Sequence, residues 1–280
     1  MNENPIQSLF SQHRPLLMGI VNLTPDSFSD GNPKATIDDF EKQAEKLIND
    51  GADILDIGGE STRPDADPVS VDEEKRRILP FLKRFRKHYP VFSVSFDTKK
   101  YEVAREVLPL SIQIINDVSF LRDPRLAQLA VEHHCFYVLM HARGDSKNMM
   151  QLTDYSPSGV VAGIKKEFEQ KLNILMEQGV PRDRLILDLG FGFAKTPDQC
   201  VELMKDLSVW KNFHLPLLFG VSRKRFLQKY TGENLPVDRD EISAKLALQA
   251  IQQGFSIIRT HNIRLTKQIL SDKSLVNPIS

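Results

Sequence analysis

Eight short apolar runs rich in β-forming residues alternate with amphipathic stretches, and this alternation restricts the folds that the chain can adopt. Such alternation is typical of βα units around a parallel sheet. Eight units in 280 residues predict an α/β fold, a single-domain (β/α)8 barrel whose functional groups gather at the carboxyl ends of the strands. The expected strands are LLMGIVN (16–22), DILDIGG (53–59), VFSVSFD (91–97), IQIINDV (112–118), CFYVLMH (135–141), RLILDLG (184–190), LPLLFGV (215–221) and SIIRTHN (256–262).

Helices are expected between these strands, and three of them end at a glycine. The apolar side chains before Gly51 repeat at helical spacing, and the glycine itself is suited to cap the helix end. The stretches 158–178 and 241–253 follow the same pattern before Gly179 and Gly254. Glycine therefore marks the expected helix ends.

The domain organisation follows from an even composition. No linker-like or low-complexity segment divides the chain, which predicts one domain. We expect an N-terminal extension (1–14), the barrel (15–275) and a short C-terminal tail (276–280).

Charge and cysteine content exclude several function classes. The 37 basic and 37 acidic side chains cancel, so no global field favours nucleic acid or an anionic membrane, and any anion must be bound by a local cationic pocket. Cys135 and Cys200 lack paired spacing, which favours reduced thiols. No signal-peptide pattern or membrane-length apolar run is present. A cytoplasmic protein without nucleic-acid or membrane partners is expected.

Polar side chains stand at the ends of the predicted strands. A single Asp or Asn in this place usually caps a helix or forms a turn. Many such residues converging on one barrel mouth favour a binding site instead. The set comprises Asn22, Asp56, Asp97, Asn116, His141, Asp188, Ser222, Arg259 and His261.

Part of this set suits an anion. Arg259 and His261 alternate along the last strand and so share a face, where a guanidinium beside an imidazole would bind phosphate oxygens. An equally good interpretation pairs Arg259 with Asp56 and leaves the histidine hydrogen-bonded in the core. The stretch SRKR (222–225) could be a solvated helix start, but cations there oppose the helix dipole, which favours a functional role for at least one of them.

Another part suits a planar ring. Asp97, Asn116, Asp188 and Lys224 combine acceptors, an amide and an ammonium, as the edge of a nitrogen-rich heterocycle requires. No Cys and His cluster has zinc-ligand spacing. A hard cation such as Mg2+, held mostly by phosphate with one protein amide or carboxylate, fits better.

Seven motifs between residues 19 and 262 carry a family resemblance. They are, in order, GIVNLTPDSFSDG, DIGGESTRP, SFDT, INDV, LDLGFGFAKT, GVSRKRF and RTHN. Together they closely resemble the dihydropteroate synthase family of folate biosynthesis, whose fold is the TIM barrel. The resemblance implies that the amine of 4-aminobenzoate displaces pyrophosphate from (7,8-dihydropterin-6-yl)methyl diphosphate to give 7,8-dihydropteroate. It also implies a Mg2+ cofactor, a homodimer, and sulfonamides as inhibitors that mimic aminobenzoate.

The family's site residues transfer to matching positions of this sequence. The pterin pocket implied by the resemblance is Asp97, Asn116, Asp188 and Lys224, with Met140 as an apolar wall. Diphosphate would be held by Asn22, Arg259 and His261, with Asn22 also on the metal, and these three with Lys224 form the catalytic set. Aminobenzoate would lie near Thr62, Pro64, Phe191, Lys224 and Ser222. Asp26, Phe28, Ser29 and Arg63 would arrive on loop closure, and Asp56 would support the site.

A dissociative mechanism is expected on physical grounds. Cations offset the charge that develops on diphosphate, and the electron-rich pterin stabilises a cationic methylene. The path is therefore SN1-like. The arylamine is neutral at pH 7 and needs orientation more than a strong base.

Three departures and three rival functions remain. Leu189 stands where the family usually has Pro, Phe96 where a smaller aliphatic is common, and Asp65 where Gly is frequent.

A methyltetrahydrofolate-dependent methyltransferase would keep the ring-binding residues but not need the diphosphate set. A Schiff-base aldolase would use Lys224. A non-catalytic pterin-binding paralogue would keep every contact.

Overall fold

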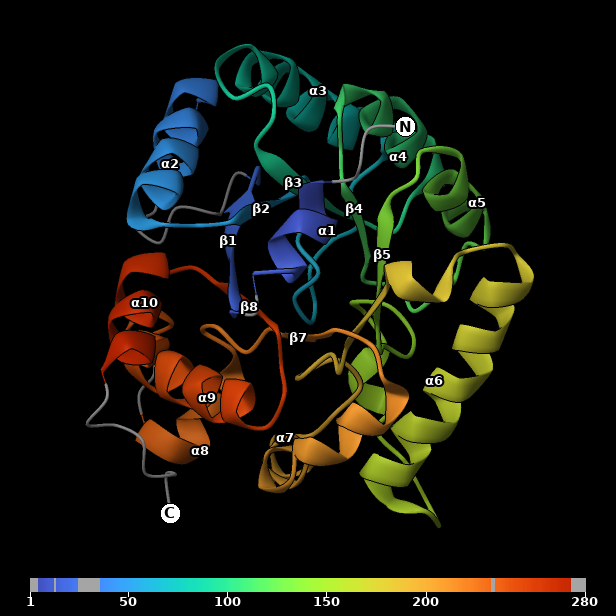
Figure 1. Cartoon of the computed structure of the whole chain (residues 1–280). Coiled ribbons are helices and arrows are strands. Elements are labelled where there is room, and N and C mark those ends of the chain that lie inside the picture. The colour runs from blue at the N-terminus through green and yellow to red at the C-terminus, as the bar shows by residue number, and fades with distance from the viewer. Residues whose placement is uncertain (1–4, 13, 25–35, 233–234, 273–280) are drawn as a thin grey trace.

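The computed structural model describes residues 5–12, 14–24, 36–232 and 235–272. Its eight parallel strands form a closed barrel in chain order, which confirms the predicted (β/α)8 fold (Figure 1). The strands are β1 (Leu16–Asn22), β2 (Ile54–Gly58), β3 (Ser93–Thr98), β4 (Ile114–Asp117), β5 (Phe136–Met140), β6 (Leu185–Asp188), β7 (Leu217–Phe219) and β8 (Ile257–Thr260). Each lies within its predicted run or extends one residue past it.

The helices form a ring outside the barrel. They are α2 (Ile37–Asp50), α3 (Val71–His88), α4 (Tyr101–Val107), α5 (Arg125–Glu132), α6 (Gly159–Glu177), α7 (Pro197–Lys205), α8 (Gln228–Thr231), α9 (Asp240–Gln252) and α10 (Ile263–Ser271). Gly51 caps α2 in the left-handed conformation, at φ 103°, which confirms its predicted role. Thr196 and Gln199 form a capping box that fixes the start of α7.

The N-terminal extension contributes a helix to the barrel itself. Helix α1 (Pro5–Phe10) lies across the centre of the strand ring in Figure 1. Ile6 is fully buried, and the ring of Phe10 lies 5.6 Å from that of Phe136 on β5. These contacts close the amino-terminal end of the barrel, a role that the sequence pattern does not reveal.

Alternate strand residues fill the lower barrel with apolar side chains, because successive side chains of a strand point to opposite faces. One buried cluster contains Leu16, Met18, Ile54, Ile114, Phe136, Val138, Ile186, Leu218 and Ile257, with Ile6 packed on it. Apolar side chains therefore fill the amino-terminal half of the barrel interior. The carboxyl end of the barrel is the end that carries polar groups.

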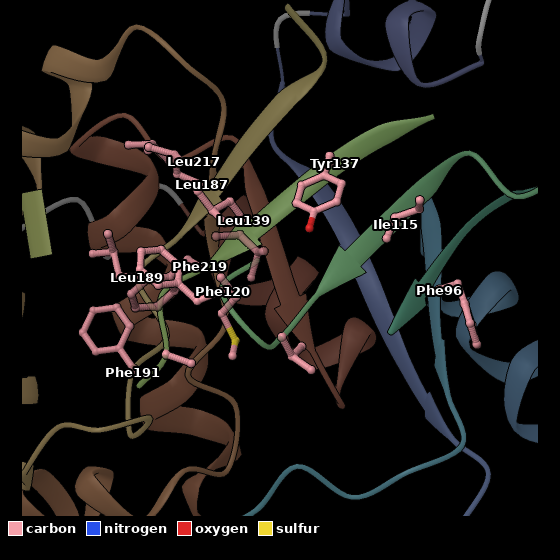
Figure 2. Packing of buried hydrophobic residues seen from close by; sticks show 14 of the residues in the cluster. Phe96, Ile115, Phe120, Tyr137, Leu139, Leu187, Leu189, Phe191, Leu217 and Phe219 are labelled. Atoms are coloured by element: carbon pink, nitrogen blue, oxygen red, sulfur yellow. The ribbon is translucent and has the colours of Figure 1, made fainter. Parts of the chain in front are cut away.

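The second core lies between the strands and the surrounding helices (Figure 2). Phe96 and Leu189, two of the departures from the family pattern, are fully buried there. Both substitutions therefore concern packing. Within the described residues, no helix is long and apolar enough to cross a membrane.

Candidate active site

Above the apolar layer, the inward-facing side chains become polar. Asp56 on β2 pairs in register with Ser95 on β3, and Asp97 on β3 pairs with Asn116 on β4. Asp56, Ser95 and Asn116 are almost fully buried. Arg259 reaches this layer from β8. The predicted cluster of strand-end residues therefore forms at the carboxyl end of the barrel.

Arg259 joins two carboxylates across the barrel. Its Nε donates to Asp56 Oδ2 at 2.6 Å, and its Nη2 donates to Asp97 Oδ2 at 3.0 Å. The alternative that pairs Arg259 with Asp56 is therefore present in the ligand-free site. It does not exclude anion binding, because a guanidinium carries five N–H donors and Nη1 has no partner among the described residues.

Asp97 is held as an acid that ionises late. Burial is the main cause, and the nearby Asp56 carboxylate adds to it, so that its pKa rises to about 8 although Arg259 opposes the shift. Two carboxylates that share one cation seldom both ionise when they are buried. Near neutral pH Asp97 therefore retains a proton that it can donate in a hydrogen bond to a ligand.

We expect Asp97→Asn to stabilise the free protein increasingly as pH rises from 5 to 8. The raised folded-state pKa makes the native state bind more protons than the unfolded state between about 4 and 8, so wild-type stability from this group is lost as pH rises through that window. The variant lacks the ionisation. The difference in Tm between variant and wild type, measured from pH 5 to 9, should grow and then level off. A constant difference would contradict the shift.

The side-chain amide of Asn116 is bonded through its nitrogen, and its oxygen has no partner among the described residues. Its Nδ2 donates to both oxygens of Asp56, at 3.1 and 3.3 Å. Its Oδ1 is buried and has no hydrogen-bond partner within the described part of the chain. A buried acceptor left unpaired costs about 1–3 kcal/mol. This amide oxygen is therefore suited to a donor on a ligand.

Asp188 ends β6 and faces Met140 across the β5–β6 register. One of its oxygens, Oδ1, accepts the N–H of Gly190 at 2.8 Å. Burial raises the pKa of Asp188, and Lys224 is the main group that opposes this rise. Gly190 adopts φ 62°, and a Cβ there would lie 1.9 Å from the carbonyl oxygen of His141. Only glycine permits this turn.

Lys224 extends from the loop after β7 toward the same place. Its Nζ donates to the carbonyl of Phe191 and lies 4.5 Å from the centroid of the Phe193 ring. Burial lowers its pKa to about 8, although Asp188 opposes the shift. The neighbouring Arg223 is bound to Asp240 at 2.7 and 2.8 Å. Within SRKR, the side chains facing the mouth are therefore those of Ser222 and Lys224.

His261 is neutral and is bonded to Ser222. Burial lowers its pKa well below the usual value, and Arg223, Arg259 and Arg63 add to the effect. The Oγ of Ser222 accepts the backbone N–H of His261 at 3.1 Å and lies 3.0 Å from Nδ1 of its ring. The Ser222 hydroxyl can donate its proton to Nδ1, and in that tautomer the ring carries its own proton on Nε2.

The loop after β2 is tied to the loop after β5. Asp65 has φ 66°, its N–H donates to Ser146 O at 2.8 Å, and its carbonyl accepts from Lys147 at 3.0 Å. The left-handed backbone explains why glycine suits this position and why Asp, which tolerates it better than most residues, can replace it. Pro64 is half-buried and Arg63 is exposed in the same loop.

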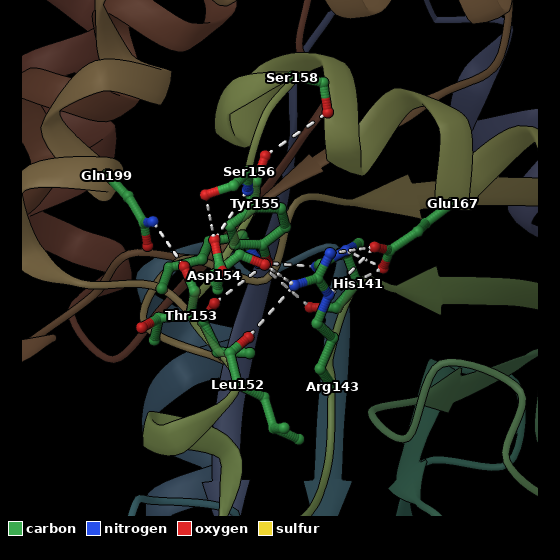
Figure 3. A network of polar contacts seen from close by, with 12 residues as sticks. His141, Arg143, Leu152, Thr153, Asp154, Tyr155, Ser156, Ser158, Glu167 and Gln199 are labelled. Carbon is green, nitrogen blue, oxygen red and sulfur yellow. Dashed lines mark hydrogen bonds and ion pairs between the residues drawn. The ribbon is translucent and has the colours of Figure 1, made fainter.

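Three groups of predicted residues fall elsewhere. The Phe191 ring is fully buried, 5.6 Å from Phe226 and 5.5 Å from Phe219, so it faces the core and only its carbonyl reaches the mouth. His141 points outward beneath α6, where it bonds Glu167 (Figure 3). It does not belong to the mouth, because inward-facing Met140 precedes it. Asp26, Phe28 and Ser29 lie outside the described residues.

Phe193 is the aromatic residue that sequence reasoning missed. It is half-buried, it lies under Lys224, and with Thr62 it lines one side of a small cavity whose other walls come mainly from the loops after β4 and β5. The motif GFGF offers two phenylalanines, and only the turn conformation decides which one faces the mouth.

Replacing the two phenylalanines should separate packing from binding. Phe191→Ala should cost about 3–5 kcal/mol of unfolding free energy, because it empties a buried aromatic site. Phe193→Ala should cost less than about 1.5 kcal/mol and reduce affinity for an aromatic ligand about tenfold, because the ring is half-exposed beside the mouth. Urea unfolding and ligand titration measure both. If Phe191→Ala instead reduced affinity and Phe193→Ala reduced stability, Phe191 would be the residue at the mouth.

The donor set at the mouth can hold a hard cation only with help from a ligand. No group of three His, Cys, Asp or Glu side chains suited to a metal occurs within the described residues. Asn22 offers an amide oxygen at the end of β1, whereas Asp56 and Asp97 are engaged with Arg259. This set fits Mg2+ bound mainly by phosphate oxygens, as Mg2+ often is in phosphoryl sites.

Comparison with known proteins agrees with this geometry. Residues 18–261 match the model of the family described as pterin-binding enzymes. The dihydropteroate synthase of Escherichia coli K12 is 38% identical over 91% of this chain and 89% of its own length. A Yersinia pestis dihydropteroate synthase solved with a sulfonamide drug has a TM-score of 0.85, with 35% identity over 92% of each chain. A Xanthomonas albilineans dihydropteroate synthase in complex with 7,8-dihydropteroate has a TM-score of 0.82, with 33% identity over 96% of this chain and 95% of its own. The barrel agrees with these structures, and the chain belongs to the pterin-binding enzymes and, among them, to the dihydropteroate synthases, a family of transferases.

Proposed function

We propose that the protein condenses (7,8-dihydropterin-6-yl)methyl diphosphate with 4-aminobenzoate to give 7,8-dihydropteroate and diphosphate. The observation that carries this proposal is one mouth with two kinds of groups. Buried Asn116 and Asp188 offer acceptors and protonated Asp97 offers a donor for a ring, while Arg259 and neutral His261 offer donors for an anion. A methyltransferase that uses a methylated folate would need the first kind alone.

The acceptors would bind the pterin by its hydrogen-bonding edge. A 2-aminopyrimidinone ring presents two adjacent N–H donors, which match the two oxygens of the Asp188 carboxylate; among the described residues Oδ1 accepts only from Gly190 and Oδ2 has no partner. The unpaired Oδ1 of Asn116 would accept from a further donor, the proton retained by Asp97 would be donated to a ring acceptor, and Met140 would cover one face. Lys224 would donate to an acceptor on the ring while keeping its contact with Phe193.

Departure of diphosphate would come first. The bond between the pterin methylene and the diphosphate oxygen breaks, and its electron pair leaves with diphosphate, whose charge is met by Nη1 of Arg259 and the Nε2 proton of His261. Asn22 would hold Mg2+, which supplies further positive charge to the leaving group. The methylene cation is stabilised by the electron-rich ring, which makes the path SN1-like.

The arylamine would then attack from the side of the loops after β2 and β6. Its ring would lie between Thr62, Pro64 and Phe193, near Lys224, with its carboxylate at Ser222. The nitrogen lone pair forms the new bond to carbon, and one N–H proton leaves to solvent. Asp26, Phe28, Ser29 and Arg63 would complete this side by loop closure.

Three further properties belong to the proposal. Sulfonamides should compete with aminobenzoate, because they share its aniline ring and an anionic group. A homodimer would use outer helices late in the chain, where Tyr230, Leu235 and Val237 are exposed beside α8 and α9. A cytoplasmic location follows from the balanced charge and reduced cysteines.

Pyrophosphate release tests the proposal directly. The purified protein with Mg2+ and the pterin diphosphate should release pyrophosphate only when 4-aminobenzoate is added, and it should form dihydropteroate. Tight binding of the diphosphate without release would instead identify a non-catalytic pterin-binding paralogue. Trapping of a carbonyl substrate on Lys224 by borohydride would favour an aldolase.

A further inference from the structure

Lys195 is buried, and no catalytic step described above uses it. It is 1% exposed and lies just after the β6 loop that carries Gly190, Phe191 and Phe193. Its Nζ lies 2.8 Å from His141 Nδ1 and donates to the carbonyls of Gly190 at 3.1 Å and Phe193 at 3.0 Å. The ammonium thus bridges both ends of one short loop and the end of β5.

The loop needs such a donor because of its backbone. Gly190, Gly192 and Ala194 all adopt left-handed conformations, with φ of 62°, 77° and 48°. A non-glycine residue there costs about 1–2 kcal/mol. This winding turns the carbonyls of Gly190 and Phe193 toward the protein interior, where Lys195 meets them. The Gly190 carbonyl also accepts the N–H of Phe193 at 2.9 Å, so it is the Phe193 carbonyl that would carry the cost of a buried unpaired acceptor without Lys195.

His141 anchors the ammonium from the other side. Burial lowers the pKa of His141 to about 3, so the ring is neutral. Since Nδ1 accepts from Lys195, its proton is on Nε2 and goes to Glu167 at 3.0 Å. Arg143 also binds Glu167 (Figure 3). The rings of Phe120 and Phe168 lie 4.8 and 5.7 Å from the imidazole. The anchor is therefore rigid.

The same loop presents three groups to the mouth. The N–H of Gly190 orients the Asp188 carboxylate, the carbonyl of Phe191 receives Lys224, and the ring of Phe193 lies below that ammonium. We propose that Lys195 is a positioning residue that holds this loop, and through it Phe193 and Lys224, in the conformation that binds the arylamine. The test of this proposal by enzyme kinetics rests on the proposed function. The test by hydrogen exchange rests only on the geometry of the loop.

The role does not depend on one charge state. Burial lowers the pKa of Lys195 to about 7. The groups that face it are Cys200, Lys224, Asp188, Glu167 and His141. Because either the ammonium or the amine can donate to both loop carbonyls, the loop stays held through neutral pH.

A double-mutant cycle tests the coupling to Phe193. Lys195→Met and Phe193→Ala should each lower kcat/KM for 4-aminobenzoate about tenfold or more, mostly through KM. If Lys195 acts through the ring, the double variant should fall only about two- to threefold below Phe193→Ala, because coupled residues are not additive. Losses that multiply would overturn the proposal. Lys165→Met is the matched control. It removes an ammonium on α6 that lies near Trp210, and it should leave kcat/KM unchanged.

Hydrogen exchange provides the readout that does not need activity. In Lys195→Met, amides of the peptide 189–194 should exchange at least about tenfold faster, while a peptide from α2 should not change. Unchanged exchange at 189–194 would overturn the proposal even if the wild-type protein lacked synthase activity. If the Met variant does not fold, Lys195→Gln, whose amide can still donate to one loop carbonyl, is carried through the same measurements with the same expectations.

Discussion

Arg259→Ala should lower kcat/KM for pyrophosphate release by about 1,000-fold. The guanidinium is the cation nearest the expected leaving group, and removing one strong transition-state donor typically costs a factor of 100 to 1,000. The change also removes the shared partner of Asp56 and Asp97, which lie 2.6 and 3.0 Å from its nitrogens. Breaking a buried ion pair from one side costs about 3–5 kcal/mol of stability.

These two effects can be separated by restoring the charge balance. In the double variant Arg259→Ala with Asp56→Asn, one buried carboxylate is neutralised, so urea unfolding should recover most of the lost stability. Its kcat/KM should stay about 1,000-fold below that of Asp56→Asn alone. Recovery of turnover together with stability would mean that Arg259 has only a structural role and that diphosphate is met elsewhere.

The barrel and the ring of mouth residues could be predicted because both follow from strand parity. Strand runs are short, apolar and evenly spaced, and most inward positions above the apolar layer are polar, with Met140 as an apolar exception. The alternation of side chains along a strand also shows that the prediction of His141 as a mouth residue was wrong. Met140 faces inward on β5, so His141 must face outward, and only its residue type had placed it at the mouth.

Features set by turns and by distant partners could not be predicted. Whether Phe191 or Phe193 faces the mouth depends on left-handed backbone at Gly190 and Gly192, which has no period in the sequence. The pairing of Arg259 with Asp97 joins residues 162 positions apart and depends on closure of the barrel. The closing of the barrel by α1 depends on contacts that no local pattern encodes.

Asp188→Asn should weaken binding of a 7,8-dihydropterin ligand about 1,000-fold with little loss of stability. The amide can still accept from Gly190 through its oxygen, which turns its NH2 group toward the ring donors that the carboxylate would accept. Two charge-assisted hydrogen bonds, each worth about 1.5–3 kcal/mol, are then replaced by a clash of donors. Burial raises the pKa of Asp188, so removing the charge does not destabilise the free protein.

Asp117→Asn is the matched control for this prediction. Asp117 is also a fully buried carboxylate at a strand end with a pKa raised by burial, but it faces outward and binds Ser119, Leu121 and Tyr137. Its replacement should lower the free energy of unfolding by about 1–3 kcal/mol and leave pterin affinity unchanged. Calorimetric titration and urea unfolding of both variants decide the matter. Equal losses of affinity would show that binding responds to general damage at the strand ends, and the assignment of Asp188 to the ring would then be wrong.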